Sequence, residues 1–208
     1  MAYQKPILFI DFNGVISYDD FWLSIRDKKH ELNKYHAEIE QFLFEDNRDI
    51  VQDWMVGKYT SEDIHKIIED NVGVDSKKLF DVFVNDCTNL DISNNILEQV
   101  VKLKPKYHII LITDNMDSLD RFTFPRHLSK LDRIFDRIDN SYNLKNLKRH
   151  NNGSYFIERL KERNSPIKRS ILIDDSNTNC EVFKGLGGIS YRTTTEQEVL
   201  DALRKISS

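Results

Sequence analysis

The N-terminal part of the chain contains the stretch Lys5-Pro6-Ile7-Leu8-Phe9-Ile10-Asp11-Phe12-Asn13-Gly14-Val15. Its apolar run, residues 7–10, is bounded by a proline and a glycine, which predicts a strand buried on both faces of a parallel sheet. Asp11 follows this strand directly. In open α/β sheets, ligands bind just beyond the carboxyl ends of the strands. A carboxylate at the end of a buried strand needs a partner such as a metal, a helix cap or a substrate. We therefore expect Asp11 to lie where the protein binds a ligand.

Two later stretches repeat this pattern of an apolar run followed by polar side chains. Residues 169–176 end in the adjacent acids Asp174 and Asp175, and residues 107–115 end in Thr113, Asp114 and Asn115. Parallel strands would bring these ends to one crevice. Carboxylates packed closely together repel one another, so they need a cation. Hard oxygen ligands beside a substrate phosphate favour Mg²⁺ as that cation.

Strand and helix patterns alternate over most of the chain, which predicts an α/β fold with a Rossmann-like parallel sheet. We expect strands near residues 6–11, 107–112, 134–138, 170–174 and, more weakly, 188–192. The helices expected between and after them cover residues 93–103, 153–163, 177–184 and 195–206.

Residues 18–90 show no strand pattern. Apolar residues recur at helical spacing from Phe21 to Phe44 and predict a first helix, and a second is expected to end at Gly57. Thr60 begins a capping-box pattern for a third helix, and Asp75 can cap a fourth. We therefore expect an α/β core made of residues 1–17 and 91–208, with an inserted α-helical cap domain at residues 18–90.

Composition narrows the classes of partner. The 208 residues carry a formal net charge of −4, which provides no basic field for nucleic acid. No apolar stretch is long enough to span a membrane, and the N-terminal residues hold no signal-peptide core. Cys87 and Cys180 lie far apart and are expected to be free thiols. We expect a cytoplasmic protein that binds neither nucleic acid nor membrane. The sequence leaves its oligomeric state open.

The order of these motifs resembles the haloacid dehalogenase-like (HAD) hydrolase superfamily. The first motif of that family is a strand followed by D-x-D-G-[TV], and the second is a strand ending in Thr or Ser. The third is a lysine downstream of a Ser-x-x-Leu stretch, and the fourth is a strand ending in paired acids. The corresponding segments here are Asp11-Phe12-Asn13-Gly14-Val15, Thr113, Ser141-Tyr142-Asn143-Leu144 with Lys148, and Asp174-Asp175-Ser176-Asn177-Thr178-Asn179.

The resemblance implies a capped, Mg²⁺-dependent phosphatase that acts on a small phosphorylated metabolite through an aspartyl-phosphate. Asp11 would be the nucleophile, and Asn13, Thr113 and Lys148 the other catalytic positions. Metal ligands would come from Asp11, the Asn13 carbonyl, Asp175 and Asp174. Asp175 would bind the metal directly, whereas Asp174 would act through water or orient Lys148. Substrate-binding positions would be Gly14, Thr113, Asp114, Asn115 and Lys148, with Ser176 and Asn179 supporting the site from behind.

The chain departs from the family pattern at two positions. Asn13 replaces an acid that would protonate the leaving oxygen and then activate water, and such acid/base help is worth about 10²–10⁴-fold. The family lysine is usually followed by proline, whereas Lys148 is followed by Arg149. Lys145 lies nearby and competes with Lys148 for the role of site lysine.

Asn13 leaves several readings open. The site can be slow, can act on a leaving group that needs no acid, or can carry Asn13 as an introduced substitution. The alternatives to a phosphatase are a dehalogenase-like or other non-phosphatase hydrolase, and a weakly active protein that binds phosphorylated metabolites. The substrate is not readable from the sequence.

Overall fold

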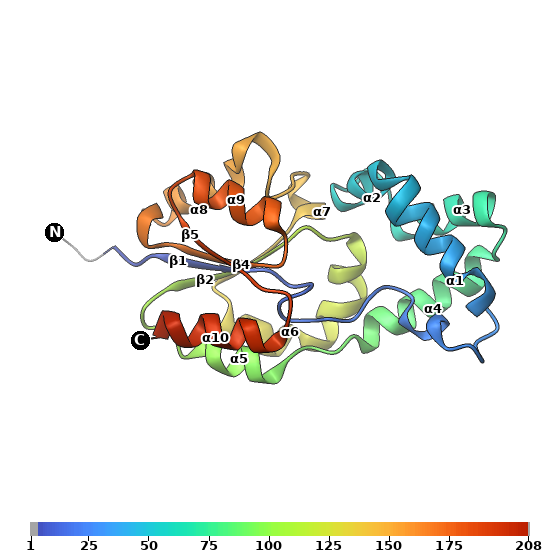
Figure 1. Cartoon of the computed structure of the whole chain (residues 1–208), viewed down its shortest axis with the longest axis horizontal. Helices are drawn as coiled ribbons and strands as arrows, with labels where there is room; N and C mark the ends of the chain where they lie inside the picture. Colours follow the sequence, from blue (N-terminus) through green and yellow to red (C-terminus); the bar gives the residue numbers. More distant parts are fainter. Residues whose placement is uncertain (1–3, 208) are drawn as a thin grey trace.

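The chain forms an α/β core with a helical segment beside it (Figure 1). The computed structural model describes residues 4–207. All five strands of the core are parallel and lie in the order β3-β2-β1-β4-β5. They are β1 Ile7–Ile10, β2 His108–Thr113, β3 Arg137–Asn140, β4 Ile171–Asp174 and β5 Ile189–Arg192. The predicted α/β fold with a parallel sheet is confirmed.

Helices cover both faces of the sheet (Figure 1). The helices α5 Asn94–Val101, α6 Phe124–Ile134 and α10 Glu196–Ser207 lie on one face, and α8 Ser154–Glu162 and α9 Asn177–Gly185 lie on the other. Within β1, Leu8 and Ile10 pack into the apolar cluster of the first face, whereas Ile7 and Phe9 pack into that of the second. Burial on both sides explains why this strand is apolar at every position.

The strand order changes direction between β1 and β4. The chain runs from β1 to β2 and β3 on one side, and then returns to place β4 on the other side of β1. Such a switch point leaves a crevice outside the carboxyl ends of the two strands. Asp11 follows β1 and Asp174 ends β4, so the fold brings these two acids to that crevice.

Residues 18–90 are all described, and none of them lies in a strand. They form a 3₁₀ turn at Leu23–Arg26, α1 Asn33–Glu40, a π-type turn at Gln41–Asp46, α2 Arg48–Met55, α3 Ser61–Val72 and α4 Ser76–Asn89. These elements pack around their own apolar cluster, whose largest buried side chains are Trp22, Trp54 and Phe83. The role of this segment as a cap stays a prediction.

Two predicted helix caps, Thr60 and Asp75, agree with the structure. Thr60 caps α3 in a capping box with Asp63, and the side chain of Asp75 accepts the backbone N–H of Lys78 at the start of α4. Ser93 caps α5 in the same way. These short side chains satisfy backbone donors that have no partner within the helix.

Other expectations about the elements are wrong. The helix expected from Phe21 does not form as one element, because Trp22 adopts the left-handed conformation with φ 52° and only a short 3₁₀ turn follows it. Helix α6 has no counterpart in the sequence prediction. Because α6 extends to Ile134, β3 begins at Arg137 rather than near residue 134.

Asp117 connects the helical segment to the core. Its buried carboxylate accepts the Trp54 indole N–H at 2.8 Å and both the backbone N–H and the hydroxyl of Ser61, at 3.1 and 2.7 Å. Arg121 donates to the same carboxylate at 2.6 Å and also pairs with Glu62. Beyond the two chain crossings, the helical segment is therefore held by a carboxylate from the loop after β2.

Two further sequence expectations can be compared with the structure. Cys87 and Cys180 are free thiols, as expected, and the structure buries both of them. None of the helices formed by residues 4–207 combines the length and apolar character needed to cross a lipid bilayer.

Candidate active site

Three carboxylates meet at the switch point of the sheet. Asp11, Asp174 and Asp175 each offer an oxygen, and these atoms all lie within 4.8 Å of one another. The backbone N–H of Asp11 donates to the carbonyl of Ile173 at 3.0 Å, which continues the pairing of β1 with β4 beyond the strand end. Asp11 and Asp174 are buried, whereas Asp175 is exposed. The cluster therefore opens to solvent on the side of Asp175.

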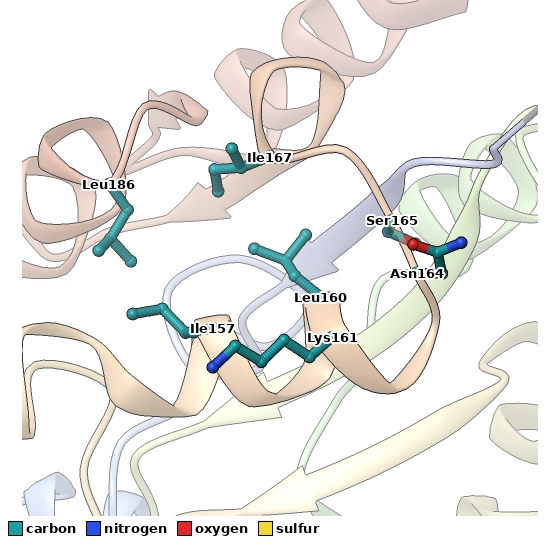
Figure 2. Close-up of a pocket in the computed structure, with 7 residues that line it drawn as sticks. All are labelled: Ile157, Leu160, Lys161, Asn164, Ser165, Ile167 and Leu186. Carbon is teal, nitrogen blue, oxygen red and sulfur yellow. The ribbon is translucent and has the colours of Figure 1, made fainter.

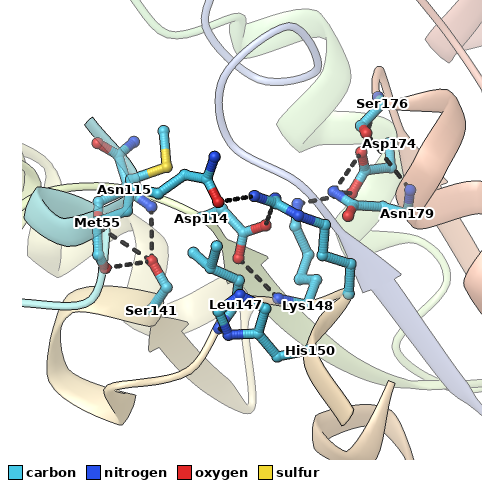
Figure 3. A network of polar contacts seen from close by, with 12 residues as sticks. Met55, Asp114, Asn115, Ser141, Leu147, Lys148, His150, Asp174, Ser176 and Asn179 are labelled. Atoms are coloured by element: carbon cyan, nitrogen blue, oxygen red, sulfur yellow. Dashed lines mark hydrogen bonds and ion pairs between the residues drawn. The ribbon is translucent and has the colours of Figure 1, made fainter. Parts of the chain in front are cut away.

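Lys148 is the cation of this cluster. Its ammonium lies 2.6 Å from Asp11 Oδ2 and 2.6 Å from Asp174 Oδ2, and its side chain is buried. The backbone N–H of Lys148 donates to Asp114 Oδ1 at 2.9 Å, which fixes the loop that carries it (Figure 3). Lys145 instead reaches the carbonyl of Gly57 and the ring of Tyr142. Lys148, and not Lys145, is the lysine beside the acids.

The pKa values reflect this crowding. Burial raises the pKa of the Asp11 carboxyl well above its usual range, and the charges of Asp174 and Asp175 raise it further against the opposing effect of Lys148. Burial alone lowers the pKa of Lys148, but the surrounding carboxylates outweigh it and raise that pKa above its ordinary value. Burial and then Asp174 raise the pKa of Asp175. One ammonium does not neutralise three acids, so the cluster retains a negative charge that a divalent cation can offset.

The donor set fits magnesium. Carboxylate oxygens are hard ligands of the kind Mg²⁺ selects, and the exposed side of the cluster leaves room for the waters that this ion keeps. Asp174 is already occupied by Lys148, by the amide of Asn179 at 3.2 and 3.3 Å, and by the backbone N–H of Ser176 at 2.9 Å (Figure 3). Asp11 and Asp175 are the more available direct ligands.

Gly14 makes room for Asp175. Its φ is +71°, a left-handed value, and its N–H donates to the carbonyl of Ser17 at 2.7 Å in the turn after Asn13. A Cβ at this position would lie 2.7 Å from Asp175 Oδ2. Close approach and left-handed backbone both require glycine here. The resemblance assigns Gly14 to substrate binding, and in the structure its contribution is the space it leaves.

Asn13 is held by the loop after β2. Its Oδ1 accepts a hydrogen bond from Asn115 Nδ2 at 2.5 Å. Asn115 is itself fixed, because its backbone N–H donates to Ser141 Oγ at 2.9 Å (Figure 3). Its Oδ1 also accepts the N–H of Met116 at 2.9 Å. The resembled family has a second acid at this position. Here the position holds the Asn13 amide, which is fixed by the Asn115 amide.

Thr113 presents an unused hydroxyl at the end of β2. The side chain is buried, and its Oγ1 has no hydrogen-bond partner among residues 4–207. A buried hydroxyl without a partner is costly, and an oxygen of a bound ligand would satisfy it. Asp114 is the next residue, and its Oδ1 accepts the backbone N–H of Lys148. This hydrogen bond positions the lysine.

Sequence reasoning missed two polar residues that support the site. Ser141 Oγ donates to the carbonyl of Met55 at 2.8 Å and accepts from Asn115, so it joins the site loop to α2 (Figure 3). Asp117 lies two residues beyond Asn115 and holds α2 and α3. The sequence placed Ser141 only in the Ser-x-x-Leu stretch, and nothing local distinguishes Asp117 from the other acids around it.

A separate apolar pocket lies beside α8. It has a volume of about 350 Å³ and is lined by Ile157, Leu160, Lys161, Asn164, Ser165, Ile167 and Leu186 (Figure 2). Lys161 is the only charged residue in that lining, and none of the clustered acids contributes to it. This pocket lacks the paired acid and base groups found at the switch point.

Comparisons with known proteins bear on the fold. No protein-family model matches the chain, and no curated protein matches it in sequence. A solved structure described as a predicted HAD-like family hydrolase from Porphyromonas gingivalis is similar, with a TM-score of 0.74 and 19% identity. The match covers 99% of this chain and 100% of that one.

Two further solved structures extend the comparison. A HAD family enzyme from Bacteroides thetaiotaomicron, in complex with magnesium and inorganic phosphate, matches with a TM-score of 0.65 and 21% identity over 90% of this chain and 93% of that one. The L-2-haloacid dehalogenase from Xanthobacter autotrophicus, with chloropropionic acid covalently bound, matches with a TM-score of 0.62 and 12% identity over 95% of this chain and 81% of that one. The chain has the fold of the HAD-like hydrolases.

Proposed function

We propose that the protein is a Mg²⁺-dependent hydrolase that releases phosphate from a small phosphorylated metabolite. The observation that carries this proposal is the cluster of Asp11, Asp174 and Asp175 around the buried Lys148. The similar enzyme from Bacteroides thetaiotaomicron was crystallised with magnesium and inorganic phosphate, which supports the same ligands here. A carboxylate cluster that keeps excess negative charge is suited to a cation and to the phosphoryl group that the cation attracts.

Asp11 is the nucleophile of the proposed reaction. One of its carboxylate oxygens attacks phosphorus, the bond from phosphorus to the ester oxygen breaks, and an aspartyl-phosphate forms. Water then attacks this phosphorus and gives a proton to solvent, the bond from phosphorus to the Asp11 oxygen breaks, and inorganic phosphate leaves with the Asp11 carboxylate restored. Lys148 stabilises charge on the phosphoryl oxygens, and the free Thr113 hydroxyl donates to one of them. Magnesium, held by Asp11 and Asp175, would neutralise phosphoryl charge when bound.

Asn13 determines which phosphate esters are hydrolysed quickly. An amide can donate a hydrogen bond, but it cannot give up a proton and later take one from water. Alkyl phosphates need a proton on their leaving oxygen, whereas aryl and acyl phosphates do not. We infer a site that turns over alkyl esters slowly and activated esters faster.

The helical segment is the proposed cap over this site. Its two connections to the core lie side by side, because Asp19 Oδ2 accepts the N–H of Asp91 at 2.8 Å and the carbonyl of Ile16 accepts that of Ser93 at 2.8 Å. Adjacent crossings near residues 16–20 and 88–92 are suited to act as one hinge. Hydrogen exchange with and without Mg²⁺ and phosphate tests this, since a hinge predicts changed protection at both crossings together.

A dehalogenase-like reaction is the second candidate. It is favoured by Asn13, which removes the acid that a phosphatase uses, and by the similarity of the fold to L-2-haloacid dehalogenases. The exposed Asp175 beside Asp174 weighs against it, because the dehalogenases that the sequence resembles need no metal. A third candidate, a weakly active phosphometabolite-binding protein, differs from the first only in turnover.

Aryl phosphate hydrolysis with and without Mg²⁺ separates the candidates. The proposal predicts hydrolysis that requires Mg²⁺, is lost in Asp11→Asn and is weakened in Asp175→Ala together with at least a tenfold loss of Mg²⁺ affinity. Glu181→Ala is a matched control, since Glu181 is an exposed acid of α9 whose carboxylate pairs with Lys184. Metal-independent release of halide from a 2-haloacid would support the dehalogenase. Tight phosphate binding without turnover would support the binding protein.

A further inference from the structure

A pocket connects Asn13 to the helical segment. Its volume is about 310 Å³, and its lining consists of Asn13, Asp20, Phe21, Arg26, Glu40 and Phe44. Asn13 comes from the core loop after β1, and the other five residues come from the helical segment. Pockets for small molecules start at about this size. Because residue 13 is the position that faces a leaving group in the proposed reaction, the pocket is placed to receive the organic part of the substrate.

The positive charge in this pocket is already matched. Arg26 Nη2 lies 2.7 Å from Asp20 Oδ2, so the guanidinium is paired with a carboxylate. The Nε–H of Arg26 also donates to His36 Nε2 at 3.4 Å. An incoming anion would therefore compete with Asp20 for Arg26.

Glu40 is the acid of this pocket with the longer ion-pair contact, since Asp20 lies 2.7 Å from Arg26. The ion-pair contact found for it within residues 4–207 is His36 Nε2 at 3.8 Å. The same nitrogen also lies 3.4 Å from Arg26 Nε, so Glu40 shares this contact with Arg26.

Aromatic rings form the rest of the lining. Phe21 and Phe44 are half-buried and border the pocket together with Glu40. The face of an aromatic ring attracts a cation, and a nearby carboxylate adds to that attraction. A leaving group with a second phosphate or a carboxylate would gain nothing from the rings and would be repelled by Glu40.

We infer that, among alkyl phosphates, the site prefers a monoester whose leaving group carries an ammonium, as in the phosphate ester of an amino alcohol, and that Glu40 recognises this charge. This inference rests on the proposed phosphatase function. It assigns the helical segment a specific task, which is to select the charge of the leaving group. The charges of Arg26 and Asp20 cancel, so Glu40 gives the pocket a net negative charge.

Three esters of similar size isolate the charge of the leaving group. Phosphoethanolamine ends in an ammonium, 2-hydroxyethyl phosphate in a hydroxyl and phosphoglycolate in a carboxylate. Their kcat/KM is measured with Mg²⁺, and their affinity is measured by calorimetry in Asp11→Asn, which cannot form the aspartyl-phosphate. A partly exposed ion pair is worth up to about 1 kcal/mol, so we expect about fivefold preference for the ammonium over the hydroxyl, with the carboxylate bound most weakly.

The Glu40→Gln variant tests the assignment, and Glu38→Gln is its control. Glu38 lies on the same helix, α1, is exposed and is not part of the pocket lining. Glu40→Gln should abolish the preference for the ammonium over the hydroxyl, whereas Glu38→Gln should retain that preference and hydrolyse aryl phosphate as the wild-type protein does. Equal treatment of the three esters by the wild-type protein, with aryl phosphate hydrolysis intact, would overturn this inference alone. Loss of binding for all three esters together with no aryl phosphate hydrolysis would overturn the proposed function.

Discussion

Replacing Gly14 with alanine is expected to damage the metal site through a single methyl group. The new Cβ would lie 2.7, 2.8 and 2.9 Å from Oδ2, Cγ and Cβ of Asp175, so the aspartate side chain has to leave its position. The left-handed backbone at φ +71° adds a cost of about 1–2 kcal/mol for any residue with a Cβ. We therefore expect two separable effects, a modest loss of stability and a large loss of Mg²⁺ affinity.

Gly73→Ala separates these two effects. Gly73 ends α3 with a similar φ of +79°, but a Cβ there would meet nothing within 4 Å. Both variants should lose about 1–2 kcal/mol of unfolding free energy in urea, because both force alanine into the same backbone region. Calorimetric titration with Mg²⁺ should show at least a tenfold weaker affinity for Gly14→Ala and wild-type affinity for Gly73→Ala. Wild-type Mg²⁺ binding by Gly14→Ala would refute the placement of Asp175 in the metal site.

Three further predictions concern other parts of the molecule. Asn13→Asp should raise the ratio of alkyl to aryl phosphate turnover by about 10²-fold, since only Asp can supply a proton to the leaving oxygen; an unchanged ratio means that Asn13 does not limit turnover. Burial lowers the pKa of His65 in the folded protein to about 4, below its value of 6.5 in the unfolded chain. The neutral imidazole therefore makes its full contribution to the unfolding free energy above pH 6.5, and about 3 kcal/mol of that free energy is lost as the pH falls to 4. Urea unfolding of the wild type and of His65→Gln, which keeps an acceptor for Trp22, should show this difference in pH slope, and parallel slopes would contradict it. Asp117→Ala should lower the unfolding free energy by about 3 kcal/mol because it leaves buried donors of Trp54 and Ser61 without a partner, whereas Asp114→Ala should spare those contacts; near-wild-type stability of Asp117→Ala in urea would contradict this.

Much of the candidate site could be predicted because its residues follow strands. Asp11, Thr113 and Asp174 each follow or end an apolar run, and parallel strands bring their carboxyl ends to one edge of the sheet. Lys148 was harder, because it lies on a loop. Its backbone N–H is held by Asp114, and its ammonium is held by Asp11 and Asp174. All three partners lie far from Lys148 in the sequence, so local patterns do not show these contacts. Sequence alone therefore left Lys145 as a competitor.

The expectations that were wrong concern tertiary contacts. Trp22 lies in an apolar pattern typical of a helix, but its indole donates to the buried His65, 43 residues away, and its backbone is left-handed. Asp117 is one of many acids in the sequence, and its partners lie 56 and 63 residues away in α3 and α2. The pairing of Arg26 with Asp20 likewise cannot be read from helical periodicity. Local patterns predict elements, whereas these side chains are placed by distant neighbours.

Because Asp117 anchors the helical segment, a chimera that contains this segment must also contain the core residues that hold it. Met116 and Phe122 pack into the apolar cluster of the segment although they lie in the core part of the chain. A graft of residues 18–90 onto a different core would lack these side chains and would leave the indole of Trp54 and the start of α3 without their acceptor. A graft that keeps these contacts therefore needs two segments, residues 18–90 and residues 116–122.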